Sequence, residues 1–206
     1  MKTYEISVDH EEDIKQLAKL LPHDLPVIEL GGGLGVASCF INGLLNPPSH
    51  TVIEANPDLI SHIEKRRDEN RCRFNVLNYA LSYTAPRIMF NVDTSFVASS
   101  ERRTCSPTII ERIEVSTIRL RDLVKEKSIV VSDIEGNEID LIDNDMKVLR
   151  EKVAYFIVEF HERISGKWQI RKSLLRLWLN GFKFVKKHSI CETCPSYLFV
   201  NKSLVR

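Results

Sequence analysis

Hydrophobic and polar positions alternate along the chain in a pattern that predicts helices and strands in turn. Residues 11–21 carry apolar side chains at helical spacing, and residues 27–30 form a short apolar run that leads into glycines. Further strands are predicted at 51–54, 72–76, 87–92, 113–118, 129–133 and 153–159, and further helices at 35–45, 56–70, 138–149 and 168–180. Strands that alternate with helices favour βαβ units and a parallel sheet.

The end of the chain departs from this alternation. Residues 182–187 and 197–200 both indicate strands, and no helix is predicted between them. They should therefore pair antiparallel, at the end of an otherwise parallel, open α/β sheet. We expect a helical N-terminal extension at 1–24 and a single domain over 25–206, because 206 residues are typical of one domain.

Composition narrows the class of protein. The chain has 43% hydrophobic and 28% charged residues and a formal net charge of +1, which is ordinary for a globular protein and argues against disorder. No apolar run approaches the roughly 18 residues that span a bilayer, and the N-terminus leads into acidic residues rather than a signal sequence. Five scattered cysteines are an odd number, so we expect reduced thiols and a cytoplasmic location.

Charge is distributed unevenly along the chain. Residues 161–206 contain ten basic and two acidic residues, which could face an anionic substrate or nucleic acid, or form a solvated helix face and strand flanks. Residues 93–108 lack periodicity and contain Arg102 and Arg103. This segment is either a mobile lid whose arginines suit an anionic substrate, or an exposed loop.

The sharpest local signal is the sequence from Val27 to Gly35, in which a strand leads into glycines and then a helix. Glycines allow a tight turn and a close approach to a ligand, and the start of the helix offers unpaired N–H groups. Glu54 ends the following strand, 19 residues after Gly35, where a carboxylate can accept hydrogen bonds from both hydroxyls of a ribose. The pattern predicts a site for an adenosine-bearing cofactor, the alternative being a turn without a ligand.

The spacing of the glycines distinguishes between such cofactors. A dinucleotide-binding turn has the pattern G-x-G-x-x-G/A, which the sequence does not match cleanly from Gly31 or from Gly33, and this disfavours an NAD enzyme. Instead, Glu29 is followed by alternating glycines. An acid at the end of the first strand suits a cofactor that is cationic or carries an amino acid. S-adenosylmethionine (SAM) has both features and is the predicted cofactor.

Several motifs together resemble the FkbM family of SAM-dependent methyltransferases. In chain order they are ELGGGLG at 29–35, VIEANP at 52–57, NYALS at 78–82, VSTIRL at 115–120, SDIEGNE at 132–138 and VEFHE at 158–162. The resemblance covers roughly residues 25–200. It implies a Rossmann-like class I methyltransferase sheet, mostly parallel, with an antiparallel C-terminal hairpin and helices on both faces.

The resemblance also implies roles for single residues. The methionine moiety of SAM would lie against Glu29, Gly31, Gly33 and Gly35. Glu54 would hold the ribose. The adenine would lie near Asn56, Asn78, Tyr79 and Ala80. A turn-forming role is the alternative for Asn78, and core packing is the alternative for Tyr79.

Methyl transfer to a hydroxyl also needs a group that accepts the hydroxyl proton. The candidates at the carboxyl ends of core strands are Asp133, Glu135, Glu159 and His161. Asp133 would face the transferable methyl, His161 has a near-neutral reference pKa, and Glu135 could instead hold a loop. These side chains could together bind a divalent metal, but their spacing does not demand one, and no metal is predicted.

A second cluster, His188, Cys191 and Cys194, could supply three zinc ligands, where a structural zinc site usually has four. A hairpin loop with incidental thiols is favoured, and a local disulfide is an alternative.

The resemblance implies O-methylation of a small hydroxylated acceptor such as a sugar, glycolipid or natural product. A nucleic-acid methyltransferase that uses the basic C-terminal region is the alternative enzyme, although base N-methylases commonly carry an N-P-P-Y/F element that is absent here. A SAM-binding partner protein without activity is the non-enzymatic alternative.

Overall fold

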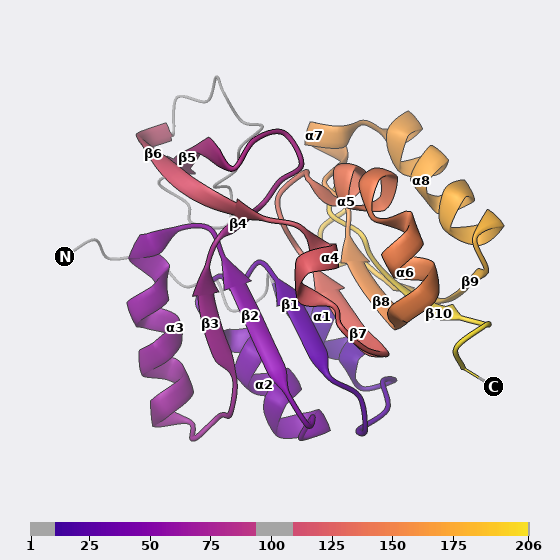
Figure 1. Ribbon diagram of the computed structural model, residues 1–206, viewed down its shortest axis with the longest axis horizontal. Coiled ribbons are helices and arrows are strands. Elements are labelled where there is room, and N and C mark those ends of the chain that lie inside the picture. Colours follow the sequence, from indigo (N-terminus) through magenta and orange to yellow (C-terminus); the bar gives the residue numbers. More distant parts are fainter. Residues whose placement is uncertain (1–10, 94–108, 206) are drawn as a thin grey trace.

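The computed structural model of the protein describes residues 11–93 and 109–205. Its main sheet has seven strands in the order β3-β2-β1-β7-β8-β10-β9 (Figure 1). In chain order they are β1 Val27–Leu30, β2 His50–Glu54, β3 Asn75–Asn78, β7 Ser128–Ser132, β8 Val153–Glu159, β9 Phe182–His188 and β10 Ser196–Asn201. All pairings from β3 to β8 are parallel, whereas β10 is antiparallel to both of its neighbours. The predicted mostly parallel sheet with an antiparallel terminal hairpin is confirmed.

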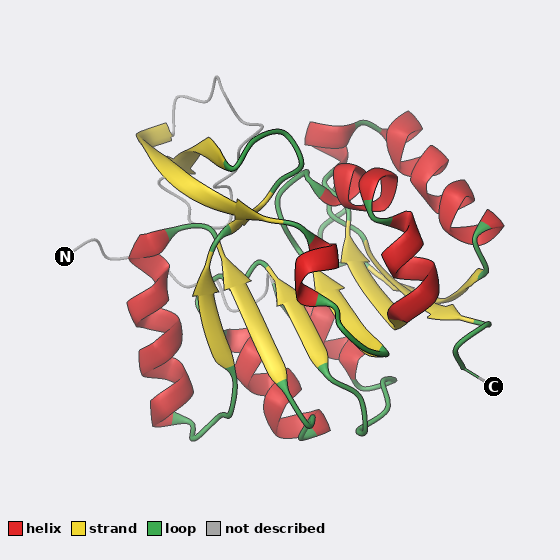
Figure 2. Ribbon diagram, viewed as in Figure 1, coloured by secondary structure: helices red, strands yellow, loops and turns green. Residues whose placement is uncertain are grey.

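Helices cover both faces of this sheet, as predicted (Figure 2). The helices are α1 Glu12–Ala18, α2 Val36–Leu45, α3 Pro57–Glu69, α4 Leu120–Leu123, α5 Glu138–Asn144, α6 Met146–Lys152, α7 Glu162–Ser165 and α8 Lys167–Leu179. Because successive strand residues point to opposite faces, Val27 packs with α1 and α2, while Ile28 belongs to the core that α4, α5, α6 and α8 cover. In the described ranges, no helix combines the length and apolar character needed to cross a membrane.

A smaller sheet lies beyond the carboxyl ends of β1, β2 and β3 (Figure 1). Its strands are β4 Ala80–Leu81, β5 Arg87–Asp93 and β6 Ile109–Ile118. β6 lies between the other two, parallel to β4 and antiparallel to β5. Its buried side chains include Ile88, Phe90 and Val115. It therefore adds an apolar wall at the edge where open α/β sheets bind ligands.

Several predicted elements were wrong in their limits by three residues or more. The first helix ends at Ala18 rather than at residue 21, and the strand predicted from residue 113 begins at Ile109. The third strand begins at Asn75 rather than at residue 72, because the chain is still closing α3 there. Arg71 has a left-handed φ of 56°, and the N–H of Cys72 donates to the carbonyl oxygen of Arg67 at 2.9 Å. The helix predicted at 138–149 is two helices, α5 and α6, with a break at Asp145. The short elements β4, α4 and α7 were not predicted.

The break at Asp145 has a tertiary cause. Its buried carboxylate accepts hydrogen bonds from the Tyr83 hydroxyl and from Nε of Arg121, both at 2.6 Å. Those partners are distant in sequence, so the helical pattern contains no sign of them.

At the other end of the chain, α1 packs with α2 against the sheet, and the limit of the N-terminal extension at residue 24 stays a prediction. The lid predicted at 93–108 lies outside the described residues except for Asp93, which ends β5.

Candidate functional site

A cavity of about 470 Å³ lies at the carboxyl ends of β1, β2, β7 and β8. The predicted site residues that line it are Glu29, Gly31, Gly33, Glu54, Ala80, Asp133, Glu135, Glu159 and His161. Gly35, Asn56 and Asn78 are not part of the lining. The structure therefore brings the predicted cofactor and catalytic residues into one space, apart from these three.

The glycine turn is shaped by a close approach between strands. Gly31 has a φ of +89°, and a Cβ atom there would lie 1.7 Å from the carbonyl oxygen of Asp133, so no larger residue fits. The N–H of Gly31 donates to the carbonyl oxygen of Ile53 at 2.9 Å. Gly35, with a φ of +76°, instead lies against α3, where a Cβ would lie 3.3 Å from Cγ2 of Ile63. Gly35 thus serves helix packing, while Gly31 ties together the ends of β1, β2 and β7.

Glu54 is buried at the end of β2 and faces the turn. Its Oε2 accepts from the N–H of Gly33 at 2.9 Å and its Oε1 from the N–H of Asn56 at 2.7 Å. Burial outweighs these hydrogen bonds and raises the pKa of Glu54 to about 7. The backbone N–H groups of Gly32 and Ala55 also face this carboxylate, which lines the cavity as a hydrogen-bond acceptor.

Glu29 lines the cavity from β1, but its carboxylate is held by the protein. The Ser38 hydroxyl donates to Oε1 at 2.8 Å, and Nε2 of His50 lies 2.9 Å from Oε2. These contacts offset the cost of burying the Glu29 side chain in a strand, and they join β1 to α2 and β2. Glu29 therefore positions the turn as well as facing the cavity.

The residues predicted around the adenine divide into two groups. Asn56 begins α3, and its Oδ1 accepts from the N–H of Asp58 at 3.1 Å, which is a helix cap. Asn78 donates from Nδ2 to the carbonyl oxygen of Glu54 at 2.9 Å and clamps β3 to the end of β2. Both side chains thus stabilise the backbone. Tyr79 and Ala80, by contrast, line the cavity, although Tyr79 also packs against the core.

The other end of the cavity is organised around the imidazole of His161, which follows β8 and is buried. Its Nε2 lies 3.4 Å from Oε1 of Glu135, 3.6 Å from Oδ1 of Asp133 and 3.7 Å from Oε1 of Glu159. Its Nδ1 lies 3.2 Å from Oε1 of Glu138. We call these five residues the His161 cluster. They come from β8, from the loop after β7 and from the start of α5, so the fold assembles them from separate segments.

Burial and neighbouring charges raise the pKa values of three residues in this cluster. Burial, followed by the charge of Glu159, raises the pKa of Asp133 well above its ordinary value. Burial raises the pKa of Glu159 to about 7, despite a hydrogen bond from the Ser196 hydroxyl at 2.7 Å. Burial lowers the pKa of His161, but Glu138 and Glu135 outweigh it and hold that pKa well above its ordinary value. Glu159 is therefore the carboxyl group of this cluster whose protonation changes near neutral pH.

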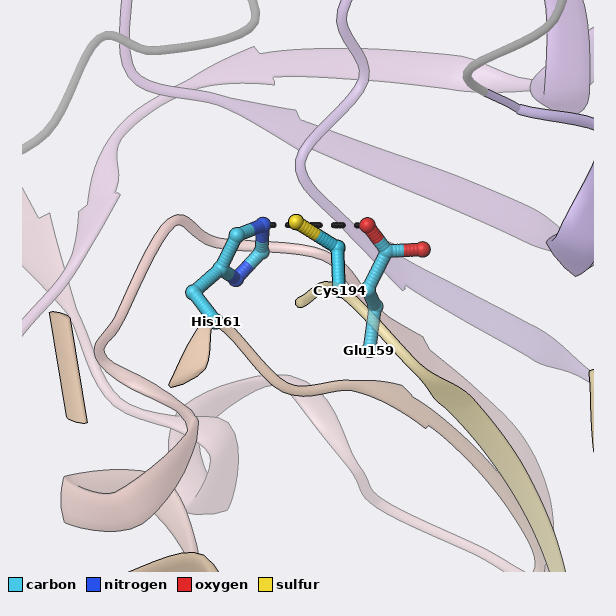
Figure 3. A group of neighbouring side chains, drawn as sticks. All are labelled: Glu159, His161 and Cys194. Carbon is cyan, nitrogen blue, oxygen red and sulfur yellow. Dashed lines mark ion pairs between the residues drawn. The ribbon is translucent and has the colours of Figure 1, made fainter. Parts of the chain in front are cut away.

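A thiol lies beside the cluster (Figure 3). One side-chain donor atom from each of Glu159, His161 and Cys194 lies within 4.8 Å of the others, a nitrogen, oxygen and sulfur set of the kind that can hold zinc. The three-ligand zinc set considered from the sequence is not assembled, because His188 bonds to Asp13 instead. Cys194 and Cys191 are free thiols, so they do not form the local disulfide.

Residues 29–188 match the family described as Methyltransferase FkbM domain. The chain belongs to this family. The matched range contains all of the predicted site residues, and the resemblance inferred from the motifs is confirmed. No curated protein sequence matches the chain.

Solved methyltransferases share the fold of this FkbM domain at low sequence identity. A methyltransferase from Pyrococcus furiosus has a TM-score of 0.57 at 9% identity, with 97% of this chain and 87% of that chain covered. An rRNA methylase from Streptococcus thermophilus has a TM-score of 0.55 at 9% identity, covering 97% and 98%. TrmK from M. capricolum, in complex with S-adenosyl-homocysteine, has a TM-score of 0.53 at 10% identity, covering 92% and 67%. Identity this low shows the fold alone.

The FkbM domain also uses residues that the sequence did not single out. Glu11 and Asp13 line the cavity from the start of the described chain, and burial raises the pKa of Glu11 to about 7. Ile88 and Phe90 supply apolar lining from β5. Glu138 contacts His161 and was present in the SDIEGNE motif, three residues after Glu135. Of these residues, only Glu138 carried a signal, because it belongs to the SDIEGNE motif that also contains Asp133 and Glu135.

Proposed function

We propose that this FkbM domain binds SAM in the cavity and transfers its methyl group to a hydroxyl of a small, uncharged acceptor. The observation that carries the proposal is one continuous cavity that joins the glycine turn and Glu54 to the His161 cluster. Transfer between two bound molecules requires both to be held in line, with water excluded. A single cavity with a cofactor end and a proton-accepting end meets this requirement.

At the cofactor end, Glu54 accepts hydrogen bonds from the ribose, and Gly31 and Gly33 allow the methionine moiety to approach the backbone. Ile88 and Phe90 provide apolar surface against which an adenine can pack. TrmK, which shares the fold, was solved with S-adenosyl-homocysteine, and this supports a related ligand here. When bound, SAM supplies an electrophilic methyl group on a positively charged sulfonium.

At the acceptor end, the His161 cluster takes the proton that the hydroxyl loses. Asp133, Glu135 and Glu159 surround Nε2 of His161, so a hydroxyl in this region has several groups within reach. A positive charge nearby lowers the pKa of a carboxylic acid. A cationic cofactor would therefore favour the ionised form of the cluster's carboxyl groups, which is the form that can accept a proton.

The charge of the cavity bears on the acceptor. Its described lining includes seven carboxyl groups and neither Lys nor Arg. His161 is the basic side chain in this described lining, and the carboxylates of its cluster surround it. Walls of this kind offer little to a phosphate or carboxylate, so they favour an uncharged or cationic acceptor over an anionic one or a nucleic acid. The prediction of an anionic acceptor rested on Arg102 and Arg103, which lie outside the described residues, and on the basic residues near the C-terminus. Seven of the ten basic residues near the C-terminus belong to α8 and β9, whose residues are not part of the lining.

Calorimetric titration with SAM tests the cofactor half of the proposal. Glu54→Ala should weaken binding by about 1.5–3 kcal/mol, the scale for hydrogen bonds to a charged group. Glu151→Ala, which removes an exposed carboxylate, is the control and should bind SAM like the wild type. Wild-type protein that does not bind SAM would refute the proposal, and equal affinity in Glu54→Ala would remove Glu54 from the ribose site.

An acceptor screen with isotopically labelled SAM tests the other half. Labelled product is expected with neutral polyhydroxylated compounds and not with their phosphorylated counterparts. Transfer to RNA alone would favour the nucleic-acid methyltransferase. Binding of SAM without transfer to any acceptor of either kind would favour the SAM-binding partner protein.

A further inference from the structure

We propose that the outward face of α8, together with β9, binds the surface of an anionic lipid bilayer. The proposal concerns a part of the molecule that does not line the cavity, and it does not depend on the methyl-transfer chemistry. In Figure 1, α8 forms the edge of the molecule opposite α3. Within residues 11–93 and 109–205, no other element covers the apolar residues on its outer side, which are exposed.

Helix α8 is apolar on two opposite sides. Its inward side carries Ile170 and Leu177, which are buried in the core. An α-helix turns by about 100° per residue, so Trp168, Leu175 and Leu179 project from the opposite side. They are 66%, 54% and 67% exposed. A helix with only one buried face normally carries polar residues on the other.

The exposed apolar residues are concentrated rather than scattered. Ten large hydrophobic residues are exposed in the described part of the chain, and six of them lie on α8 or β9. These six are Trp168, Leu175, Trp178, Leu179, Phe184 and Val185. Single exposed apolar residues are common on soluble proteins, but a concentrated group marks an interaction surface. Neighbouring residues of β9, such as Phe184 and Val185, point to opposite faces of the sheet, so the outer side of α8 carries the apolar surface and β9 borders it. We call the two together, with their basic residues, the α8–β9 face.

The charge of the α8–β9 face has one sign. Residues 163–191 contain no Asp or Glu. Lys167 is 3.6 Å from Glu162 and Arg176 is 2.8 Å from Asp143, so these two cations are paired. The remaining basic side chains, for which no ion pair with a described residue is found, are Arg171, Lys172, Lys183, Lys186 and Lys187. The face therefore complements a negatively charged surface.

The combination of Trp, Leu and Lys side chains indicates what kind of surface the α8–β9 face binds. Trp side chains favour the boundary between lipid and water, and the transfer of a Leu side chain from water to an apolar phase lowers its free energy. Nζ of Lys172 lies 5.5 Å from the centroid of the Trp168 ring, so charge and aromatic surface are presented together. A second copy of the chain would bring like charges into contact. A nucleic acid would satisfy the cations but would offer little to Leu175 and Leu179. An anionic bilayer satisfies both.

Sedimentation of the full-length protein with lipid vesicles tests the proposal. Binding is expected to vesicles of phosphatidylcholine mixed with phosphatidylserine and to be much weaker with phosphatidylcholine alone, and salt should reduce it. Arg171→Gln with Lys172→Gln should lower the partition coefficient by about 30-fold, from the usual contribution of two basic residues near an anionic membrane. Trp168→Ser with Leu175→Ser and Leu179→Ser should lower it by at least tenfold, roughly what the lost apolar burial implies.

Control variants test whether a loss of vesicle binding is specific to the α8–β9 face. Lys19→Gln with Lys65→Gln removes the same charge elsewhere on the surface, and Leu20→Ser removes an exposed leucine near α1. Both should bind vesicles like the wild type. Four outcomes would overturn the proposal: no vesicle binding, equal losses in the controls, binding to RNA without binding to vesicles, or a dimer that the serine variant dissociates. Because α8–β9 variants leave the cavity intact, SAM titration of each variant separates this proposal from the proposed function.

Discussion

Nδ1 of His161 lies 3.2 Å from Oε1 of Glu138, and this contact determines which ring nitrogen faces the cavity. The same oxygen of Glu138 accepts from the N–H of Ile134 at 3.1 Å and from that of Gly136 at 3.2 Å. Glu138 is fully buried, so its position is fixed by the backbone of the loop after β7. The imidazole is oriented by a rigid group, and Nε2 is left to meet the other carboxylates of the cluster.

Removing the proton-accepting groups should separate catalysis from cofactor binding. For His161→Asn and for Asp133→Asn, SAM affinity should stay within roughly threefold of the wild type, while turnover falls by about 10²–10⁴. The reason is positional, since Glu54, which is proposed to hold the ribose, ends β2, whereas Asp133 follows β7 and His161 follows β8. Calorimetry and steady-state kinetics on the acceptor found in the screen check this. A parallel loss of SAM affinity would place these residues in the cofactor site.

Glu138→Gln should move the pH profile of turnover without abolishing activity. Burial lowers the pKa of His161 and the charge of Glu138 opposes that effect, so removing the charge should lower the pKa of His161. The acidic limb of kcat against pH should therefore shift to lower pH. A purely structural role for Glu138 would reduce kcat at all pH values and leave the shape of the profile unchanged.

The sequence predicted local features of the site better than tertiary ones. The glycine turn and Glu54 follow from strand, turn and helix signals that are adjacent along the chain. The four candidate catalytic residues could be gathered because carboxyl ends of parallel strands meet at one edge. Asn56 and Asn78 were placed around the adenine by motif position, yet their side chains bond to the backbone. Whether a side chain beside a site faces a ligand or the backbone depends on loop geometry, which periodicity does not encode.

Two glycine substitutions should change stability in opposite directions. Gly31→Ala should destabilise the protein by several kcal/mol, on the order of the largest single-residue effects, because its Cβ would lie 1.7 Å from the carbonyl oxygen of Asp133. Gly43 lies inside α2, and a Cβ there would meet nothing within 4 Å. Gly43→Ala should therefore stabilise by about 0.5–1 kcal/mol. Urea denaturation of both variants measures the difference, and a well-folded, stable Gly31→Ala protein would contradict the described turn.

Asn56→Ala tests whether Asn56 is a helix cap or a cofactor ligand. Loss of the hydrogen bond from the N–H of Asp58 should cost about 1 kcal/mol of unfolding free energy. SAM affinity should change little, since Asn56 is not part of the cavity lining. Asn56→Ser, which retains a capping oxygen, should recover most of the stability. A loss of SAM affinity at unchanged stability would reverse the assignment.

Glu159→Gln should stabilise the unliganded protein, and the gain should grow with pH. The pKa of Glu159 in the folded protein is about 7, above its ordinary value, chiefly because it is buried. A raised pKa means that folding favours the protonated acid. The wild type therefore keeps its full stability below the ordinary pKa and loses part of it as pH rises through about 7. Glutamine stays neutral throughout, so the variant escapes this loss, which is up to about 3 kcal/mol.

Chemical denaturation of both proteins from about pH 5 to about pH 8 measures the difference directly. The two stabilities should be similar at the acidic end and diverge towards the alkaline end, with the variant more stable. Glu151→Gln, at an exposed site, should show no such divergence from the wild type. A variant that is less stable than the wild type at alkaline pH would mean that the Ser196 hydroxyl and His161 stabilise the ionised carboxylate more than burial destabilises it. In that case Glu159 would already be ionised in the empty cavity, and it could accept a proton before a cationic cofactor binds.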